Sequence, residues 1–318
     1  MQSEGVPGPR AGQAATHPPP WRVIGAFVLG ALGIAFSAIF VRLALPAPPV
    51  VTGFYRMLFA LLPLGLLVWL RREEGHSTRA GVAWAALAGT FLGTDLALWH
   101  TAVVGTSVAN ATLLVNTTPI PVGIYSAWVL RERPGAAFLV GTAFALLGTT
   151  LLLGSDRDLG ATGLTGDGLA LAAALFYAAY LILMKRVRRG VDALRGTLAA
   201  TGGAVAAMGI YALLRGDPFA GFPAQSWWAF LGAAWISQLG GVLGIVWGLR
   251  WLRATFASVT LLVQPLGTAL LGWILLGEAI GPLQALGGAA LLAGIFVASR
   301  AGLDPNPGAS PGGTRCVP

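Results

Sequence analysis

The sequence predicts an all-α membrane protein in which ten transmembrane helices form two inverted five-helix repeats. Hydrophobic residues make up 56% of the chain and charged residues only 10%, whereas soluble domains carry about 25% charged residues. Ten apolar stretches have the length, about 20 residues at 1.5 Å rise, that a helix needs to cross a roughly 30 Å hydrocarbon core. The closing stretches of two groups of five match at a constant offset of 146 positions.

The predicted elements follow one another with short connections. A β-barrel would require alternating strands of about ten residues, and the sequence shows none. Residues 1–20 and 302–318 are rich in proline or glycine and lack a periodic apolar pattern, so we expect flexible tails there. The two repeats then occupy 21–155 and 156–301. The ten predicted spans are 22–44, 48–70, 80–102, 107–130, 135–154, 165–187, 193–214, 226–248, 255–277 and 281–300.

The repeat is visible in individual residues. Pro119 and Glu132 recur as Pro265 and Glu278, thirteen residues apart in both halves. Because each unit has an odd number of spans, the second copy must enter the bilayer inverted relative to the first, and inverted repeats are the architecture of alternating-access carriers. The sequence therefore predicts a transporter. Further matches at the same offset pair Gly141 with Gly287, Ala143 with Ala289, Leu146 with Leu292, and Gly148 with Gly294.

The distribution of basic residues predicts the orientation. With a cytoplasmic N-terminus, 16 of the 20 Lys and Arg residues fall on the cytoplasmic side, whereas only Arg157 and Arg215 fall in loops on the other side. The positive-inside rule therefore predicts that both tails are cytoplasmic. Attraction to the anionic cytoplasmic leaflet accounts for the net charge of +8 without a nucleic-acid partner.

Several short motifs resemble the EamA-type branch of the drug/metabolite transporter superfamily, over about residues 22–300. The resemblance implies a carrier that moves small organic metabolites across the plasma membrane, here a bacterial inner membrane, most often outward. It also implies that the first four spans of each repeat enclose a central cavity, with spans 5 and 10 more peripheral. The motifs are Ala97-Leu-Trp-His100, Thr106-Ser-Val-Ala-Asn-Ala-Thr-Leu-Leu114, Pro119, Leu130-Arg-Glu132, Gln264-Pro265, Leu276-Gly-Glu278 and Leu286-Gly-Gly-Ala289.

Asp95 and Arg56 are the most informative ionisable residues, because a charge inside the bilayer is costly unless it is paired or hydrated. Both lie seven or eight residues from the outer ends of adjacent predicted spans, a depth of roughly 10–12 Å by helical rise. We therefore expect them to form a coupled pair. One hypothesis is a substrate or proton site in a cavity, and the other is a structural ion pair between spans 2 and 3.

Three neighbouring residues have weaker functional signals. His100 is expected at the outer interface beside Trp99, and a proton relay to Asp95 is the less favoured alternative because five residues separate them by about 140° around a helix. Trp99 either lines the cavity or faces lipid. Arg42 ends the first span, where we expect an interfacial anchor rather than a ligand contact.

Neutral polar residues in the spans are candidates for hydrogen bonds to a solute: Asn110 and Asn116 in span 4, Gln238 in span 8 and Gln264 in span 9. The alternative is that they join helices to one another. Asn116 and Gln264 are favoured because Pro119 and Pro265 interrupt their spans, and matching interruptions in two repeats point to a carrier's site. Glycine strips such as Gly89 with Gly93 are expected to allow close helix contact.

Glu132 and Glu278 end spans 4 and 9. A carboxylate at a helix C-terminus opposes the helix dipole, so each needs another partner, such as Arg133 or the N-terminus of the following helix. We interpret these residues, with Pro119 and Pro265, as hinge or gating positions.

Enzyme classes find little support in the sequence. It contains no phosphate-binding loop and no HExxH zinc motif, so we expect no cofactor and no metal. The expected partners are a small-molecule solute and the lipid bilayer, with a monomer as the simplest assembly. An intramembrane enzyme using Asp95 and His100 and a passive channel remain the alternatives.

Overall fold

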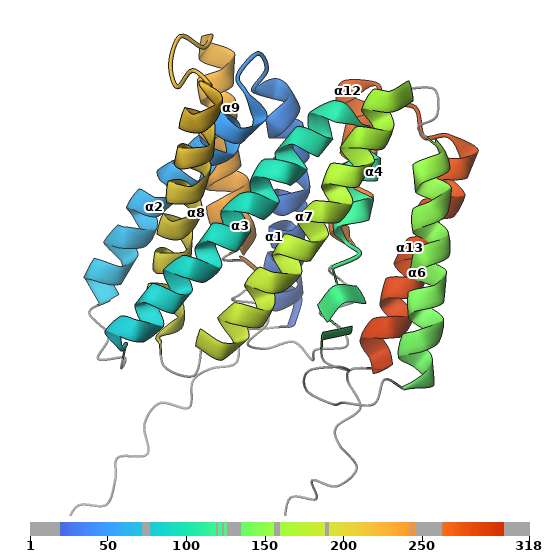
Figure 1. Ribbon diagram of the computed structural model, residues 1–318, viewed down its shortest axis with the longest axis horizontal. Coiled ribbons are helices and arrows are strands. Elements are labelled where there is room, and N and C mark those ends of the chain that lie inside the picture. The colour runs from blue at the N-terminus through green and yellow to red at the C-terminus, as the bar shows by residue number, and fades with distance from the viewer. Residues whose placement is uncertain are drawn as a thin grey trace, which may run out of the picture.

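The computed structural model describes residues 20–71, 77–118, 120–122, 124–125, 135–155, 160–187, 191–242, 244–245 and 263–301, and these residues contain helices but no strand (Figure 1). The predicted all-α class is confirmed. The helices are α1 (Pro20–Leu43), α2 (Pro49–Arg71), α3 (Arg79–Gly105), α4 (Val108–Val115), α6 (Ala136–Ser155), α7 (Gly160–Val187), α8 (Ala193–Arg215), α9 (Ala224–Gly232), η2 (Ala233–Gly241), α12 (Val263–Leu276) and α13 (Pro282–Ala301).

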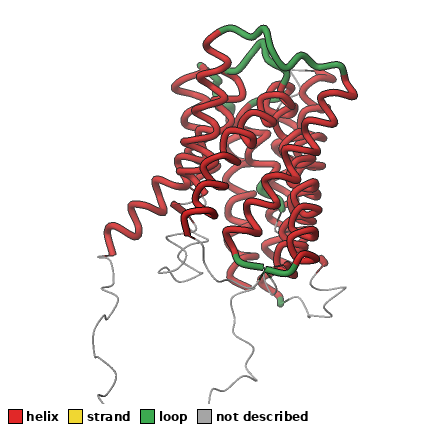
Figure 2. Tube along the Cα trace, turned by 90° about the vertical axis from the view of Figure 1, so that its left-hand side faces the viewer, coloured by secondary structure: helices red, strands yellow, loops and turns green. Residues whose placement is uncertain are grey.

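The helices form an elongated bundle whose connecting loops collect at its two ends (Figure 2). Five of them, α1, α2, α3, α7 and α8, are long and apolar enough to cross a membrane. The π-helix η2 continues directly from α9, so that the two form one element. Shorter apolar helices lie within α6, α12 and α13. Lengths and compositions of this kind belong to a multi-pass membrane protein.

Helices α6 and α13 pack against each other at one side of the bundle (Figure 1). A Cβ at Gly148 would lie 2.6 Å from the carbonyl oxygen of Gly287, and a Cβ at Gly294 would lie 2.5 Å from that of Gly141. Adding 146 to Gly141 and Gly148 gives Gly287 and Gly294, so the two contacts are equivalent. This equivalence is expected if a twofold pseudosymmetry relates the repeats. The residues that match in sequence are therefore the residues at which the two equivalent helices touch.

The same pseudosymmetry organises the other helices. Helix α1 packs on η2 and α12, and its counterpart α7 packs on α3 and α4, the elements equivalent to those two. Helices α2 and α8, which are equivalent to each other, are in mutual contact. Gly89 of α3 lies directly against the backbone of Ala200, and Gly203 of α8 lies against that of Ala86. The expected close contact at Gly89 is therefore present.

The fourth predicted span differs from the structure. Helix α4 ends at Val115, and the N–H groups of Asn116, Thr117 and Thr118 donate to carbonyl oxygens three residues back, at 3.1–3.2 Å. This tighter turn precedes Pro119, and a residue before proline disfavours the α conformation. The continuous helix predicted over 107–130 is therefore wrong. Pro119 and Glu132 themselves lie outside the described residues.

Candidate functional site

Arg56 of α2 is buried and joins three helices. Its Nη2 donates to Oε1 of Gln238 at 2.9 Å, and its Nε reaches the same oxygen at 3.3 Å. Its Nη1 donates to the hydroxyl of Ser37 in α1. The Arg56 guanidinium thus holds α1, α2 and η2 together. Arg56 belongs to the first repeat and Gln238 to the second, so this contact also joins the repeats.

Gln238 lies in η2, a π-helix, which has more residues per turn than an α-helix. Short π segments occur often at functional sites. In η2 the carbonyl oxygen of Ile236 lies close to Gly33 of α1, since a Cβ at Gly33 would approach it to 2.9 Å. Close packing of α1 and η2 therefore places Ser37 and Gln238 on either side of the Arg56 guanidinium.

We expect Arg56 and Gln238 to be energetically coupled. Arg56→Met and Gln238→Leu should each lower the free energy of unfolding in detergent by about 1.5–3 kcal/mol, the usual contribution of a hydrogen bond to a charged group. The double variant should lose less than the sum, because each single variant leaves a buried polar group without its partner. Losses that add to within about 0.5 kcal/mol would show that the contact contributes nothing.

Asp95 of α3 is also buried, and its Oδ1 has no hydrogen-bond donor among the residues that the structure describes. The expected ion pair with Arg56 is not formed, because no Arg56 nitrogen lies within 4.0 Å of the Asp95 carboxylate. The guanidinium binds Ser37 and Gln238 instead. Arg56 and Asp95 are nonetheless both buried, on α2 and α3, which contact each other. Asp95 is therefore an incompletely satisfied charge in the interior.

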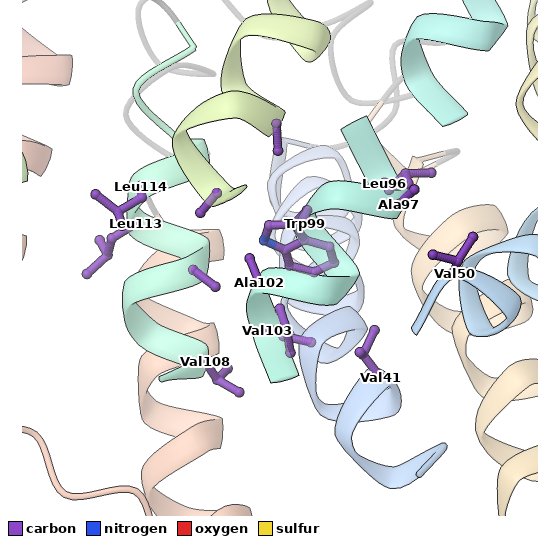
Figure 3. Close-up of a cluster of buried hydrophobic side chains, with 14 of the residues drawn as sticks. Val41, Val50, Leu96, Ala97, Trp99, Ala102, Val103, Val108, Leu113 and Leu114 are labelled. Atoms are coloured by element: carbon purple, nitrogen blue, oxygen red, sulfur yellow. The ribbon is translucent and has the colours of Figure 1, made fainter. Parts of the chain in front are cut away.

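Two tyrosines of α7, Tyr177 and Tyr180, form an aromatic pair. Their rings are stacked, with centroids 5.9 Å apart and an interplanar angle of 22°. Trp99 lies one turn beyond Asp95 on α3 and is buried, so the lipid-facing alternative for Trp99 is wrong. Figure 3 shows that Trp99 belongs to a cluster of buried hydrophobic side chains that also contains Ala102, Val103 and Leu114. Its indole Nε1 has no partner in the described part of the chain.

His100 is fully buried rather than interfacial, so the expected belt position is wrong. The reason is that α3 continues to Gly105, three residues beyond the predicted end of its span. The His100 Nδ1 lies 3.1 Å from the carbonyl oxygen of Pro49, and because a carbonyl can only accept, Nδ1 carries the proton of the neutral ring. This bond ties α3 to the start of α2, and the described contacts include no hydrogen bond from His100 to Asp95.

Arg42 and Glu278 meet at one end of the bundle. The Arg42 Nη2 lies 3.4 Å from Glu278 Oε1 and donates to the carbonyl oxygen of Thr106 at 2.6 Å. Glu278 Oε2 accepts from the N–H of Val108 at 2.9 Å. Glu278 thus binds the N-terminus of a helix, as expected. The helix is α4 of the other repeat, however, and not the helix that follows Glu278. Arg42 is more than an interfacial anchor.

Polar side chains beside this contact join α4 and the end of α3 to two further helices, α13 and α7. The amide of Gln284 in α13 donates to Oδ1 of Asn110 and to the hydroxyl of Ser107, both at 2.9 Å. Thr106 donates to the buried Asp167 of α7 at 2.8 Å. Asn110 therefore joins α4 to α13, which agrees with the alternative that the polar residues of the spans connect helices. Gln284 and Asp167 escaped the sequence analysis because they lie near predicted span ends, where polar residues are usually interfacial.

The remaining candidates lie apart from Asp95. The Asn116 amide donates to the carbonyl oxygen of Thr112 at 2.7 Å, within its own segment. Gln264 is partly exposed, and Pro265 is buried in the first described turn of α12. A separate cavity of about 360 Å³ lies between α3, α7 and α8, where Thr94, Leu98 and Thr101 line it. Neither Asp95 nor Arg56 lines this cavity.

Comparison with known proteins decides the family. The model of the EamA-like transporter family matches residues 21–154 and 164–300. The chain belongs to this family. It is 27% identical over 275 residues to an uncharacterized transporter of Archaeoglobus fulgidus, covering 86% of this chain and 95% of the relative. It is also 27% identical over 256 residues to the uncharacterized transporter YwfM of Bacillus subtilis, covering 80% and 86% of the two chains.

A solved structure titled "Crystal structure of protein" shares the fold, with a TM-score of 0.59, 19% identity, and coverage of 86% of this chain and 96% of that one. Family membership confirms the resemblance seen in the motifs, and with it the predicted architecture of two repeats in a multi-pass membrane protein. The names of the EamA relatives indicate a transporter rather than an enzyme. In the described residues, no group of three or more His, Cys, Asp or Glu side chains could hold a metal ion.

Proposed function

We propose that this chain is a secondary carrier that exports a small organic metabolite across the plasma membrane by alternating access. The two repeats, at 21–155 and 156–301, rock against each other, and the solute binds at the core cluster, which we define as Arg56, Asp95, Trp99 and Gln238. Family membership and the pseudosymmetric packing of the repeats support a carrier. The observation that supports this site best is the Asp95 carboxylate, buried with an oxygen that lacks a donor.

The chemistry of the core cluster favours a solute that carries both charges. An unpaired carboxylate in a low-dielectric interior costs several kcal/mol, and a cationic group of the solute would offset that cost. The Arg56 fork has N–H groups beyond those used by Ser37 and Gln238, and these suit an anionic or carbonyl group. Aromatic faces nearby add attraction for a cation.

A library of small metabolites tests this site by thermal stabilisation of the purified carrier, because a ligand that binds only the folded state raises the melting temperature. We expect stabilisation by zwitterions and loss of that stabilisation in Asp95→Asn. Stabilisation by neutral solutes alone, unchanged in Asp95→Asn, would contradict the proposed site. Chemical conversion of the solute would favour the enzyme alternative, and a steady non-saturating current would favour the channel.

We also propose that both termini are cytoplasmic and that the chain acts as a monomer. The asymmetry of the basic residues supports the orientation. In a Cys316→Ser background, Asp217→Cys should react with a membrane-impermeant thiol reagent added to intact cells, because Asp217 follows α8 at the outer end. Ser77→Cys, between α2 and α3, should react only after the membrane is opened. The reverse pattern would invert the assignment.

A further inference from the structure

The end of α12 turns the Glu278 side chain back over its own helix. Gly277 has a φ of +71°, a left-handed conformation that glycine adopts without steric cost. The N–H of Glu278 then donates to the carbonyl oxygen of Gly272 at 3.2 Å, which closes the helix. Gly272 also leaves room for the carboxylate, since a Cβ there would lie 3.3 Å from Glu278 Oε2. The Leu276-Gly-Glu278 motif therefore delivers a carboxylate to the neighbouring α4.

The carboxylate binds α4 and α1 at once. It accepts from Val108 N at the first turn of α4, where the side chain of Ser107 caps the same helix, and a negative charge is stabilised at a helix N-terminus. Its other oxygen meets Arg42 at the end of α1, and Arg42 in turn binds the carbonyl oxygen of Thr106. Val108, Arg42 and Thr106 all belong to the first repeat, and Glu278 belongs to the second. The contact therefore joins the repeats.

The position of this contact suits a closure that opens and reseals. The side chains of Arg42 and Glu278 are 27% and 22% exposed, so both charges can be hydrated when they separate. Arg56, Asp95 and Trp99 of the core cluster, in contrast, are buried. On the same face of α4, Thr112 lies one turn deeper than Val108 and is buried, with no hydrogen-bond partner for its hydroxyl in the described part of the chain.

We propose that Glu278, Arg42 and the N-terminus of α4 form the outer latch of the carrier. Glu278 must release Val108 N and Arg42 before the interior becomes accessible at this end. The inference rests on the proposed alternating access. Accessibility of the interior to a labelling reagent can be measured without transport, so the latch and the carrier proposal can fail separately.

The first experiment measures labelling of Thr112→Cys in a Cys316→Ser background, from the side of the membrane that labels Asp217→Cys. Adding Glu278→Gln should raise the labelling rate about tenfold, because a charge-assisted hydrogen bond changes an equilibrium by at least that order. Gly272→Ala should act in the same direction but more weakly, since a Cβ 3.3 Å from Glu278 Oε2 forces the carboxylate to shift slightly without removing a latch residue. It also provides a second variant if Glu278→Gln folds poorly.

Asp217→Asn is the matched control. Asp217 pairs with Arg215 at 3.5 Å at the same end of the bundle, but both residues belong to one repeat, so its loss should leave labelling of Thr112→Cys unchanged. Equal labelling in the parent, Glu278→Gln and Gly272→Ala proteins would overturn the latch. A similar increase in the Asp217→Asn control would also overturn it.

A designed disulfide tests the same latch in the opposite direction. A Cβ at Gly272 would lie 3.7 Å from Val108 Cβ, within the range of about 3.5–4.5 Å that disulfides adopt. Oxidation of Val108→Cys with Gly272→Cys, in the Cys316→Ser background, should stop solute movement, and reduction should restore it. Equal transport by the oxidised and reduced protein would contradict the latch, whereas absence of transport in the parent would contradict the carrier proposal alone.

Discussion

Replacing Asp95 by asparagine is expected to reduce solute movement by about 100-fold while the protein stays folded. The change keeps the shape of the side chain but removes the charge, and a charge-assisted hydrogen bond contributes about 1.5–3 kcal/mol, or roughly 10- to 150-fold. Because the Asp95 Oδ1 has no donor in the described structure, the uncharged amide should leave the melting temperature equal or higher. Uptake into proteoliposomes and thermal unfolding of the same preparation provide the two measurements.

The two measurements separate the interpretations of Asp95. Loss of transport with full stability assigns Asp95 to the solute or proton, whereas loss of both makes it structural. Asp217→Asn serves as the control, since Asp217 lies in the loop after α8 and pairs with Arg215 rather than with the core cluster. Normal transport by Asp95→Asn would remove Asp95 from the site altogether.

Replacing Gly203 by alanine is expected to destabilise the protein by about 1–3 kcal/mol, the usual cost of overpacking a tight contact. A Cβ there would meet the carbonyl oxygen of Ala86 and lie 2.9 Å from its carbonyl carbon. These are backbone atoms of α3, so the helices themselves must separate. Unfolding in detergent, by heat or by a denaturing detergent, measures the loss.

The adjacent glycine gives a matched control. A Cβ at Gly202 would meet no atom within 4 Å, so Gly202→Ala on the same helix should be neutral or slightly stabilising. If the two alanine variants unfold alike, close approach of α3 and α8 at Gly203 does not contribute to stability.

The sequence predicted the helices and their repeat well, because apolar length and an offset of 146 are properties of the chain itself. The glycines of α6 and α13 are an example, since Gly148 lies against Gly287 and its match Gly294 lies against Gly141. The depth estimate also placed Arg56 and Asp95 correctly in the interior. Their partners could not be predicted, because Gln238 is 182 residues from Arg56 in sequence and lies in a π-helix whose winding shifts the side-chain register.

Two errors had physical causes that a sequence does not display. The position of His100 followed from a span ending at residue 102, but α3 continues to Gly105 and buries the ring. The N-terminus of the following helix was an expected partner for Glu278. The left-handed Gly277 instead reverses the chain and gives the carboxylate the N-terminus of α4, in the other repeat.

Solute counterflow in proteoliposomes tests the central claim most directly, because it requires one site that is exposed alternately to the two sides. With unlabelled solute inside and a trace of labelled solute outside, an alternating-access carrier should accumulate the label transiently above its equilibrium level. The uptake should saturate, and Asp95→Asn should abolish it. Label that only approaches equilibrium, at the same rate with and without internal solute, would contradict the carrier.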